Sequence, residues 1–188
     1  MLRWLTNLGP ESRSLQEIHR HFLQMLQDGR HVFDAAANAL LGGTDPTVVR
    51  EDLYRTDARI NRTEQQIRRD IVVHGSIHGS ATFPALLVMM SLVKDAERVG
   101  DFGKNIYSLA AQRPSLGTEE QRRELIEHKD HISKMIARAH GLFVKQSEEG
   151  ARLFLQESSD LEALFEAKIN EGLAVVGENA TGRTLAYR

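Results

Sequence analysis

The chain has 188 residues, of which 41% are apolar, and its 24 lysines and arginines nearly balance 26 aspartates and glutamates, giving a formal net charge of −2. This composition is typical of a chain that folds around an apolar core, and it provides no electrostatic surface for nonspecific nucleic-acid binding. The chain has no cysteine, which excludes a disulfide scaffold, a thiolate zinc site and a cysteine nucleophile.

No segment of the sequence has the features of a membrane anchor or a cleavable signal. The longest apolar stretch, residues 83–93, is well short of the roughly 20 residues that a membrane-spanning helix needs. Residues 1–8 lack a long apolar core followed by small residues. We therefore expect a cytoplasmic protein that is at most peripheral to a membrane.

Proline and glycine divide the sequence into segments of about 30 to 40 residues, and almost none of these segments shows the alternation of a strand. Residues 14–17 and 118–121 each form a capping box, in which two side chains satisfy backbone donors at a helix start. Asp45 and Pro46 are a third start signal, because the carboxylate accepts from free amides and proline has no N–H group to satisfy. The sequence therefore predicts helices at residues 14–42, 45–74, 80–113, 118–149 and 151–172.

The first three predicted helices are each about 30 residues long and span on the order of 45 Å at about 1.5 Å per residue. Because short connections make consecutive helices antiparallel, these three predict an elongated bundle, followed by a helical pair. We therefore expect an all-α fold with two units. An antiparallel three-helix bundle occupies residues 12–114, and a second, incomplete helical bundle occupies residues 118–188.

Acidic residues interrupt the apolar face of the second predicted helix. Positions spaced four and three residues apart form one stripe toward the core, and two of its six residues, Asp57 and Glu64, are acidic. Asn61 lies four residues after Asp57 and borders the stripe. A carboxylate in a bundle core is unfavourable unless a cation or a hydrogen-bond network compensates it. The stripe consists of Leu53, Asp57, Ile60, Glu64, Ile67 and Ile71.

The third predicted helix carries a second acidic group at the border of its apolar seam. Glu97, Asp101 and Asn105 follow one another at intervals of four residues, so they project from one stripe. Antiparallel packing places the middle of this helix beside the middle of the second helix, and we therefore expect the two acidic groups to face each other. Gly100 lies between these acids, where glycine is unfavourable by about 1 kcal/mol relative to alanine. Its presence favours a close helix contact or space beside the acids.

The sequence leaves two explanations of these acids open. Lys94, Arg98 and Lys104 lie three or four residues from acidic side chains on the third helix and can form ordinary ion pairs on a solvated face. Alternatively, a hard or borderline cation binds between the helices through mostly oxygen ligands. Solvated acids seldom occupy two alternate seam positions, which weighs in favour of the cation.

Two segments together resemble the PhoU family. Residues 97–101 (Glu-Arg-Val-Gly-Asp) and 105–106 (Asn-Ile) match the family's hallmark, a Glu-Arg-Ile-Gly-Asp segment followed by Asn-Ile on the third helix. The family pairs this hallmark with an acidic Asp-x-x-x-Asp type of segment on the second helix, for which residues 57–64 (Asp-Ala-Arg-Ile-Asn-Arg-Thr-Glu) stand here. The second aspartate of the Asp-x-x-x-Asp segment is replaced by Asn61 here, so this chain departs from the doubly acidic form.

The resemblance implies two three-helix repeats, a multinuclear metal cluster held by paired acidic motifs, and negative regulation of bacterial phosphate uptake. The implied partners are a phosphate ABC transporter and a membrane-bound sensor histidine kinase. The implied metal is divalent or trivalent, with iron or zinc expected first and manganese or magnesium next. Carried onto this sequence, four acids become metal ligands and two asparagines become weaker or supporting ligands: Asp57, Glu64, Glu97 and Asp101, with Asn61 and Asn105.

The second repeat departs from the family pattern. Residues 125–173 resemble its first two helices in length and position, and Glu162 and Glu166 could stand for the acidic positions. No second Glu-Arg-Ile-Gly-Asp segment follows, so we expect at most one metal cluster of the family type per chain. An incomplete bundle also exposes apolar surface, and we therefore expect a homo-oligomer.

No sequence signature of catalysis accompanies these acids. The chain lacks a glycine-rich phosphate loop, a dinucleotide fingerprint, a Gly-x-Ser-x-Gly elbow and a His-Glu-x-x-His segment, so we expect no enzymatic activity. One alternative is a ferritin-like di-metal enzyme, which needs Glu-x-x-His pairs on two helices, whereas only residues 127–131 offer such a group. We interpret that group as a solvated helix face, and His74 and His78 as loop or capping residues. The other alternative is a purely structural interaction bundle.

Overall fold

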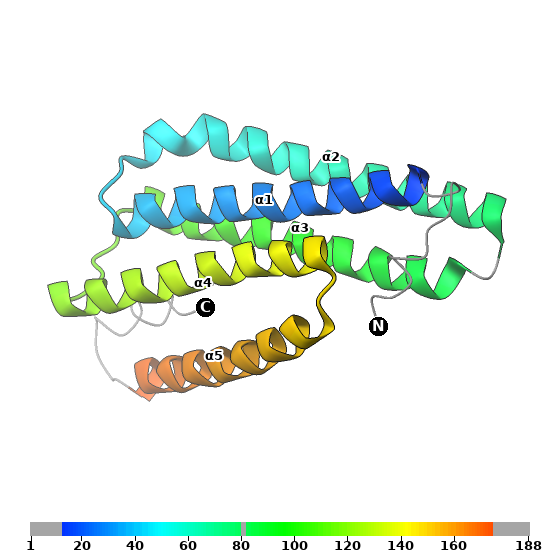
Figure 1. Cartoon of the computed structure of the whole chain (residues 1–188). Coiled ribbons are helices and arrows are strands. Elements are labelled where there is room, and N and C mark those ends of the chain that lie inside the picture. Colours follow the sequence, from blue (N-terminus) through cyan, green and yellow to red (C-terminus); the bar gives the residue numbers. More distant parts are fainter. Residues whose placement is uncertain (1–12, 80–81, 175–188) are drawn as a thin grey trace.

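The structure is a computed structural model that describes residues 13–79 and 82–174. Within these residues the chain forms five α-helices and no strand, which confirms the predicted all-α fold. None of these helices combines the length and the apolarity that a membrane crossing needs. Residues 1–12, the predicted helix start at residue 80 and the end of the second predicted unit lie outside the described residues. The helices are α1 (Arg13–Leu41), α2 (Pro46–His78), α3 (Phe83–Ala111), α4 (Glu119–Lys145) and α5 (Glu148–Ala174) (Figure 1).

The first three helices form the antiparallel bundle that the sequence predicts. Each of them packs against the other two, and consecutive helices run in opposite directions (Figure 1). α4 lies against α1, on the side of α1 away from α2, and α5 contacts α4. The division of the chain into units at residues 12–114 and 118–188 stays a prediction.

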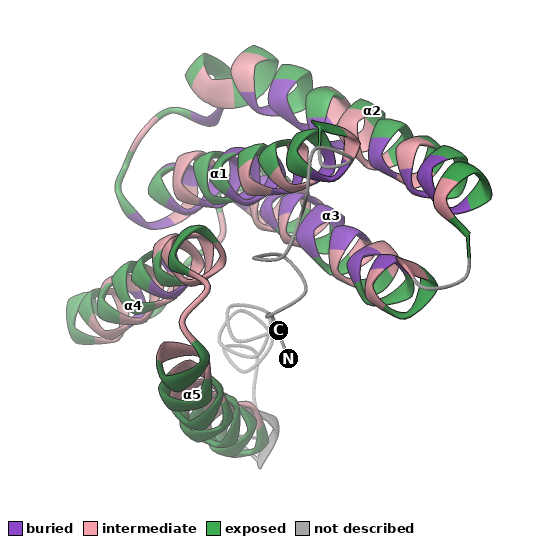
Figure 2. Cartoon of the chain, turned by 45° about the vertical axis from the view of Figure 1, so that its right-hand side comes forward, coloured by how far each residue is buried: buried purple, intermediate pink, exposed green. Residues whose placement is uncertain are grey.

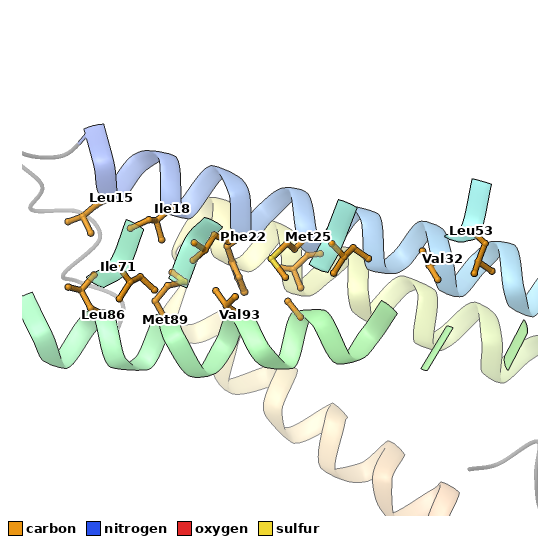
Figure 3. Packing of buried hydrophobic residues seen from close by; sticks show 14 of the residues in the cluster. Leu15, Ile18, Phe22, Met25, Val32, Leu53, Ile71, Leu86, Met89 and Val93 are labelled. Carbon is orange, nitrogen blue, oxygen red and sulfur yellow. The ribbon is translucent and has the colours of Figure 1, made fainter. Parts of the chain in front are cut away.

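Apolar side chains on the facing sides of α1, α2 and α3 build the core. Figure 2 shows the buried residues on the sides of these helices that face one another, and Figure 3 shows their side chains meeting between the helices. Met25 of α1 and Val93 of α3 are completely buried, and Met89 of α3 is 1% exposed. Fully burying one such side chain contributes about 1.5–3 kcal/mol, so this core is the main source of stability. All four apolar residues of the predicted α2 stripe are buried: Leu53, Ile60, Ile67 and Ile71.

Two helix starts are those that the sequence predicts. Asp45 caps α2 by accepting a hydrogen bond at 2.9 Å from the backbone N–H group two residues later, and Pro46 lies in the first turn. Thr118 caps α4 in a capping box, because its hydroxyl and the Gln121 side chain each accept from the other residue's backbone N–H group. The capping box predicted at the first helix is wrong, since Ser14 lies inside α1.

The predicted end of the second helix is wrong because it comes too early in the chain. α2 continues to His78, and Gly79, with φ at +78°, ends it. Gly75 is buried inside the helix, where a Cβ atom would lie 3.1 Å from the Phe83 ring. His74 is likewise buried in α2 and not in a loop, with its ring 4.2 Å from the ring of His78. Glycine at position 75 therefore serves packing between α2 and α3.

The predicted boundary between the fourth and fifth helices is also wrong, because it comes too late. α4 ends at Lys145 and α5 begins at Glu148. Between them Gln146 adopts the left-handed conformation, with φ at 52°, which glycine usually supplies at the end of a helix. Gly150 instead lies in the first turn of α5, where a Cβ atom would lie 2.6 Å from Leu142 of α4.

An aromatic contact and several polar contacts hold α4 on α1. The ring of Phe143 packs edge-on against Phe22, with 4.8 Å between the ring centroids, and joins the border of the core. The hydroxyl of Ser133 donates to Asp34 at 3.1 Å and accepts from Arg30 at 3.0 Å. This interface is therefore more polar than the core between α1, α2 and α3.

α3 approaches α1 so closely at Gly103 that no side chain fits there. A Cβ atom at this position would lie 2.6 Å from Cγ1 of Val32 and 3.1 Å from the backbone carbonyl carbon of the same residue. Gly29 makes the reciprocal contact on α1, where a Cβ atom would lie 3.1 Å from Cγ1 of Val99. Because the helix backbone cannot turn aside as the end of a side chain can, Gly103 sets the distance between α1 and α3.

Gly103→Ala should lower the free energy of unfolding by about 1–3 kcal/mol, because the added methyl group forces the two helix backbones apart. Urea unfolding followed by circular dichroism measures this quantity. Gly141→Ala is the matched control: residue 141 also lies inside a helix, but no atom lies within 4 Å of the added Cβ position. The control should stabilise the chain by up to about 1 kcal/mol. Equal stability of the two variants would contradict the close approach.

Candidate functional site

The acids predicted to form the site lie between α2 and α3, and we call Asp57, Glu64, Glu97 and Asp101 the acidic cluster. Asp57 and Glu97 are buried, with 7% and 9% of their surface exposed, so they do not belong to a solvated face. The two helices come together at Gly100, where a Cβ atom would lie 2.9 Å from a side-chain carbon of α2 and 3.7 Å from Oδ1 of Asp57. The close helix contact expected at Gly100 is confirmed.

Lys104 joins the two sides of the acidic cluster. Its Nζ atom lies 3.0 Å from Oδ1 of Asp57 on α2 and 2.8 Å from Oδ1 of Asp101 on α3. One ammonium group thus pairs with a carboxylate from each helix, which confirms that the two acidic groups face each other. Burial lowers the pKa of Lys104, but its hydrogen bonds to Asp101 and Asp57 outweigh burial and leave that pKa raised. The hydrogen bond from Lys104 also holds the pKa of Asp101 below its ordinary value.

Lys94 and Arg68 neutralise the remaining carboxylates of the acidic cluster. The Nζ atom of Lys94 lies 2.7 Å from Oε2 of Glu97. This hydrogen bond raises the pKa of Lys94, and the charges of Glu64 and Asp101 add to the effect. The Glu64 carboxylate pairs with the Arg68 guanidinium group at 3.1 Å. Each carboxylate of the acidic cluster therefore has a cationic partner from the protein itself.

The two asparagines predicted as supporting ligands differ in their positions. Asn61 donates from Nδ2 to Oδ2 of Asp57 at 3.4 Å, so it lies beside the acidic cluster. Asn105 is exposed on the surface of α3. Glu162 and Glu166, considered as acidic positions of a second repeat, are exposed on α5. The structure therefore joins Asp57 to Asp101 through Lys104, with Asn61 beside Asp57, and places Asn105 at the surface.

As arranged, the acidic cluster does not fit a metal ion. A hard cation needs several oxygen atoms that converge on one point. Across residues 13–79 and 82–174, no group of three or more acidic or histidine side chains is arranged to hold a metal. The Oδ1 atoms of Asp57 and Asp101 instead bind the Lys104 ammonium group. Of the two explanations left open by the sequence, the geometry supports ion pairing. The sequence explanation placed these pairs on a solvated face, whereas two of the paired acids are buried.

The segment that holds these helices matches a known family. Residues 22–110, which run from α1 to the end of α3, match the family model described as the PhoU domain. We call residues 22–110, the segment that this family model matches, the PhoU domain. This match confirms the resemblance drawn from residues 57–106, and the acidic cluster lies within the matched segment. Neither a curated protein nor a solved structure matches the chain.

The sequence does not predict two ion pairs that join helices of the PhoU domain. Lys104 lies three residues after Asp101 on the acidic stripe of α3, and this spacing is the signal that could have placed it opposite Asp57. The second pair joins α1 to α2: Arg59 donates to the two carboxylate oxygens of Asp28 at 2.6 and 2.8 Å. Asp28 is 4% exposed, so this pair also compensates a buried charge.

His128 and His131 of α4 lie outside the PhoU domain, at the contact with α5. His128 is partly buried, with its ring edge-on to Phe165 at 5.3 Å and its Nε2 atom 3.7 Å from Glu124. The solvated face predicted for residues 127–131 is therefore wrong at His128. His131 is exposed as predicted, and its Nε2 atom lies 3.2 Å from Glu157 of α5.

Asp101→Asn should make stability less dependent on pH under acidic conditions. Lys104 lowers the pKa of Asp101 in the folded chain below the ordinary value of 3.8. The ionised carboxylate therefore stabilises the fold above about pH 4, and this contribution is lost as the pH falls through the folded pKa. The effect is modest, because the Asp101 side chain is 44% exposed and water screens the pair.

Urea unfolding of the wild type and of Asp101→Asn across acidic and neutral pH tests this expectation. The difference in unfolding free energy should stay constant near neutrality and shrink below about pH 4. A difference that keeps its neutral value in acid would contradict the assigned ion pair.

Proposed function

We propose that this chain regulates phosphate uptake, or signalling that responds to phosphate, by contact with other proteins. The observation that carries the proposal is the PhoU domain at residues 22–110, because the family's role lies in the regulation of phosphate uptake. The geometry supports a binding role, since each carboxylate of the acidic cluster pairs with a cation of the protein itself. We further propose that the chain is not an enzyme and that it acts in the cytoplasm as a negative regulator.

The proposed partners are a phosphate ABC transporter and a sensor histidine kinase. Exposed apolar side chains at the end of the α2–α3 hairpin, which we call the apolar tip, support a protein contact. Large exposed apolar patches on proteins mark interaction sites. The apolar tip consists of Val72, Val73, Ile77, Phe83, Leu87 and Val88, which are 44% to 70% exposed.

Self-association stays a prediction, and α5 supports it. In residues 148–171, where exposure is described, α5 has no buried residue. Figure 2 shows the contrast with the largely buried faces of α1 and α3. Leu153, Leu155 and Leu164 are 41% to 64% exposed, which leaves apolar surface that a second copy of the chain could cover.

The sequence also predicts metal binding by the acidic cluster, with iron or zinc first and manganese or magnesium next. The proposed function does not include metal binding, and no step of it depends on a metal. The alternative of a purely structural interaction bundle is favoured by the ion pairing of the cluster. The ferritin-like alternative lacks such support, because His128 and His131 face α5 and its acids.

Deleting the gene in cells that encode this chain should raise phosphate uptake severalfold when phosphate is plentiful, because a restraint on the transporter is removed. Uptake of radiolabelled phosphate measures this effect, and expression of the wild-type chain should restore the restraint. The same uptake with and without the chain, at high and at low phosphate, would contradict the proposed function.

The complementation experiment also tests the apolar tip. Ile77→Ser/Leu87→Ser should fail to restore the restraint and should bind the purified transporter about tenfold more weakly or worse, as loss of buried apolar anchors does. Val48→Ser/Val144→Ser is the matched control, since these valines are 75% and 53% exposed outside the tip. The control should behave as the wild type, and all variants should melt at the wild-type temperature. Loss of binding in both variants would contradict a specific role of the tip.

A further inference from the structure

We propose that Lys104 itself supplies the cation of the acidic cluster. Its ammonium group occupies the position in which the acidic motifs predict a metal ion, and it links α2 to α3 without a metal. This inference concerns the cluster alone and does not rest on the proposed function. It follows from the mismatch between the acidic motifs, which resemble those of a metal site, and the contacts that these acids make.

The contacts of Lys104 are those of a bridging cation. Its Nζ atom lies within hydrogen-bond distance of one carboxylate from each helix, at 3.0 Å from Asp57 and 2.8 Å from Asp101. The distance to Asp101 is typical of a strong hydrogen bond between charged groups, and the distance to Asp57 is that of an ordinary hydrogen bond. The Lys104 side chain is 27% exposed and that of Asp57 is 11% exposed, so water screens their attraction less than it would at the surface.

The position of Lys104 in α3 explains how one side chain reaches both carboxylates. Lys104 lies three residues after Asp101 and seven after Glu97, so it projects from the same stripe as these acids. Gly100 lies one turn earlier and brings α3 close to α2, with its Cβ position 3.7 Å from Oδ1 of Asp57. The flexible four-carbon stem of the lysine therefore has a short distance to span.

A metal ion and the Lys104 ammonium group compete for the same oxygen atoms. Hard divalent cations bind carboxylate oxygens at about 2.0–2.6 Å. An ion between the Oδ1 atoms of Asp57 and Asp101 would thus lie against a positive charge that already pairs with both. Lys94 adds a second positive charge at Glu97. Together these lysines offset two of the four negative charges of the cluster, and Arg68 offsets a third at Glu64, which reduces the excess negative charge that attracts a metal ion.

The first arm of the test asks whether the wild-type chain uses a metal. The full chain, purified without chelator, is measured by elemental analysis, and its melting temperature is recorded in EDTA and in millimolar Mg²⁺, Mn²⁺ and Zn²⁺. We expect no stoichiometric metal and the same melting temperature in each condition, since a ligand that binds the folded state would raise it. Stoichiometric metal that is lost in Glu97→Ala/Asp101→Ala would overturn the proposal.

The second arm measures the link that Lys104 makes. Lys104→Met should lower the melting temperature by about 4 to 8 °C, because Asp57 is left buried without its cation. Arg98→Met is the matched control, since Arg98 pairs on the same helix with Asp95 and both side chains are 60% exposed. The control should change the melting temperature little. Equal effects of the two substitutions would overturn the proposal.

Two further variants keep the test informative if the Lys104→Met chain does not fold. Asp57→Asn/Lys104→Met removes both charges, so it should melt higher than Lys104→Met and lose less than the two single substitutions combined. Lys104→Arg, which keeps the charge, should lie closer to the wild type than Lys104→Met does. Additive losses in the double variant would show that the two residues are not coupled and would overturn the proposal.

Discussion

The close approach of α3 to its two neighbours is the constraint on which the rest of the bundle depends. It is set at Gly100 and Gly103, where a Cβ atom would collide with a side chain of α2 and with the Val32 side chain of α1, whose backbone lies just beyond. Because protein interiors are close-packed, two helices lie nearer to each other where glycine leaves no side chain between them. Those distances let apolar residues of three helices share one core, and they bring carboxylates of α2 within reach of a lysine on α3.

The acidic cluster would oppose this packing if its charges had no partners. Carboxylates from adjacent helices repel one another strongly where little water screens them. Lys104 converts that repulsion into a link between α2 and α3, and the pair of Arg59 with Asp28 makes a comparable link between α1 and α2. Each link joins two helices, so it fixes their register and also compensates the buried carboxylate. These ion pairs therefore link the three helices of the PhoU domain to one another. The domain can present a surface to a partner without any reaction at the acidic cluster.

Features that depend on neighbouring residues could be predicted from the sequence, whereas features that depend on how helices meet could not. The starts of α2 at Asp45 and of α4 at Thr118 are predictable, because a cap satisfies backbone groups within one turn. The ends are not, because Gly75 serves packing and Gln146 takes a conformation that no glycine signals. The facing of the two acidic groups follows from antiparallel helices of similar length. The reach of Lys104 to the opposite helix depends on the rotation and separation of α2 and α3, which no local pattern encodes.

The sequence separation of the contacts between α1 and α4 bears on the order in which the fold forms. Helices that are joined by short connections close small loops at little entropic cost, and bundles rich in such contacts fold fast. Ser133 of α4, by contrast, bonds to Arg30 and Asp34, which lie 103 and 99 positions away. The segment matched to the PhoU domain ends at residue 110, before α4 begins. The three-helix bundle can therefore form on the ribosome while α4 is still being synthesised, and α4 then docks onto a surface that already exists.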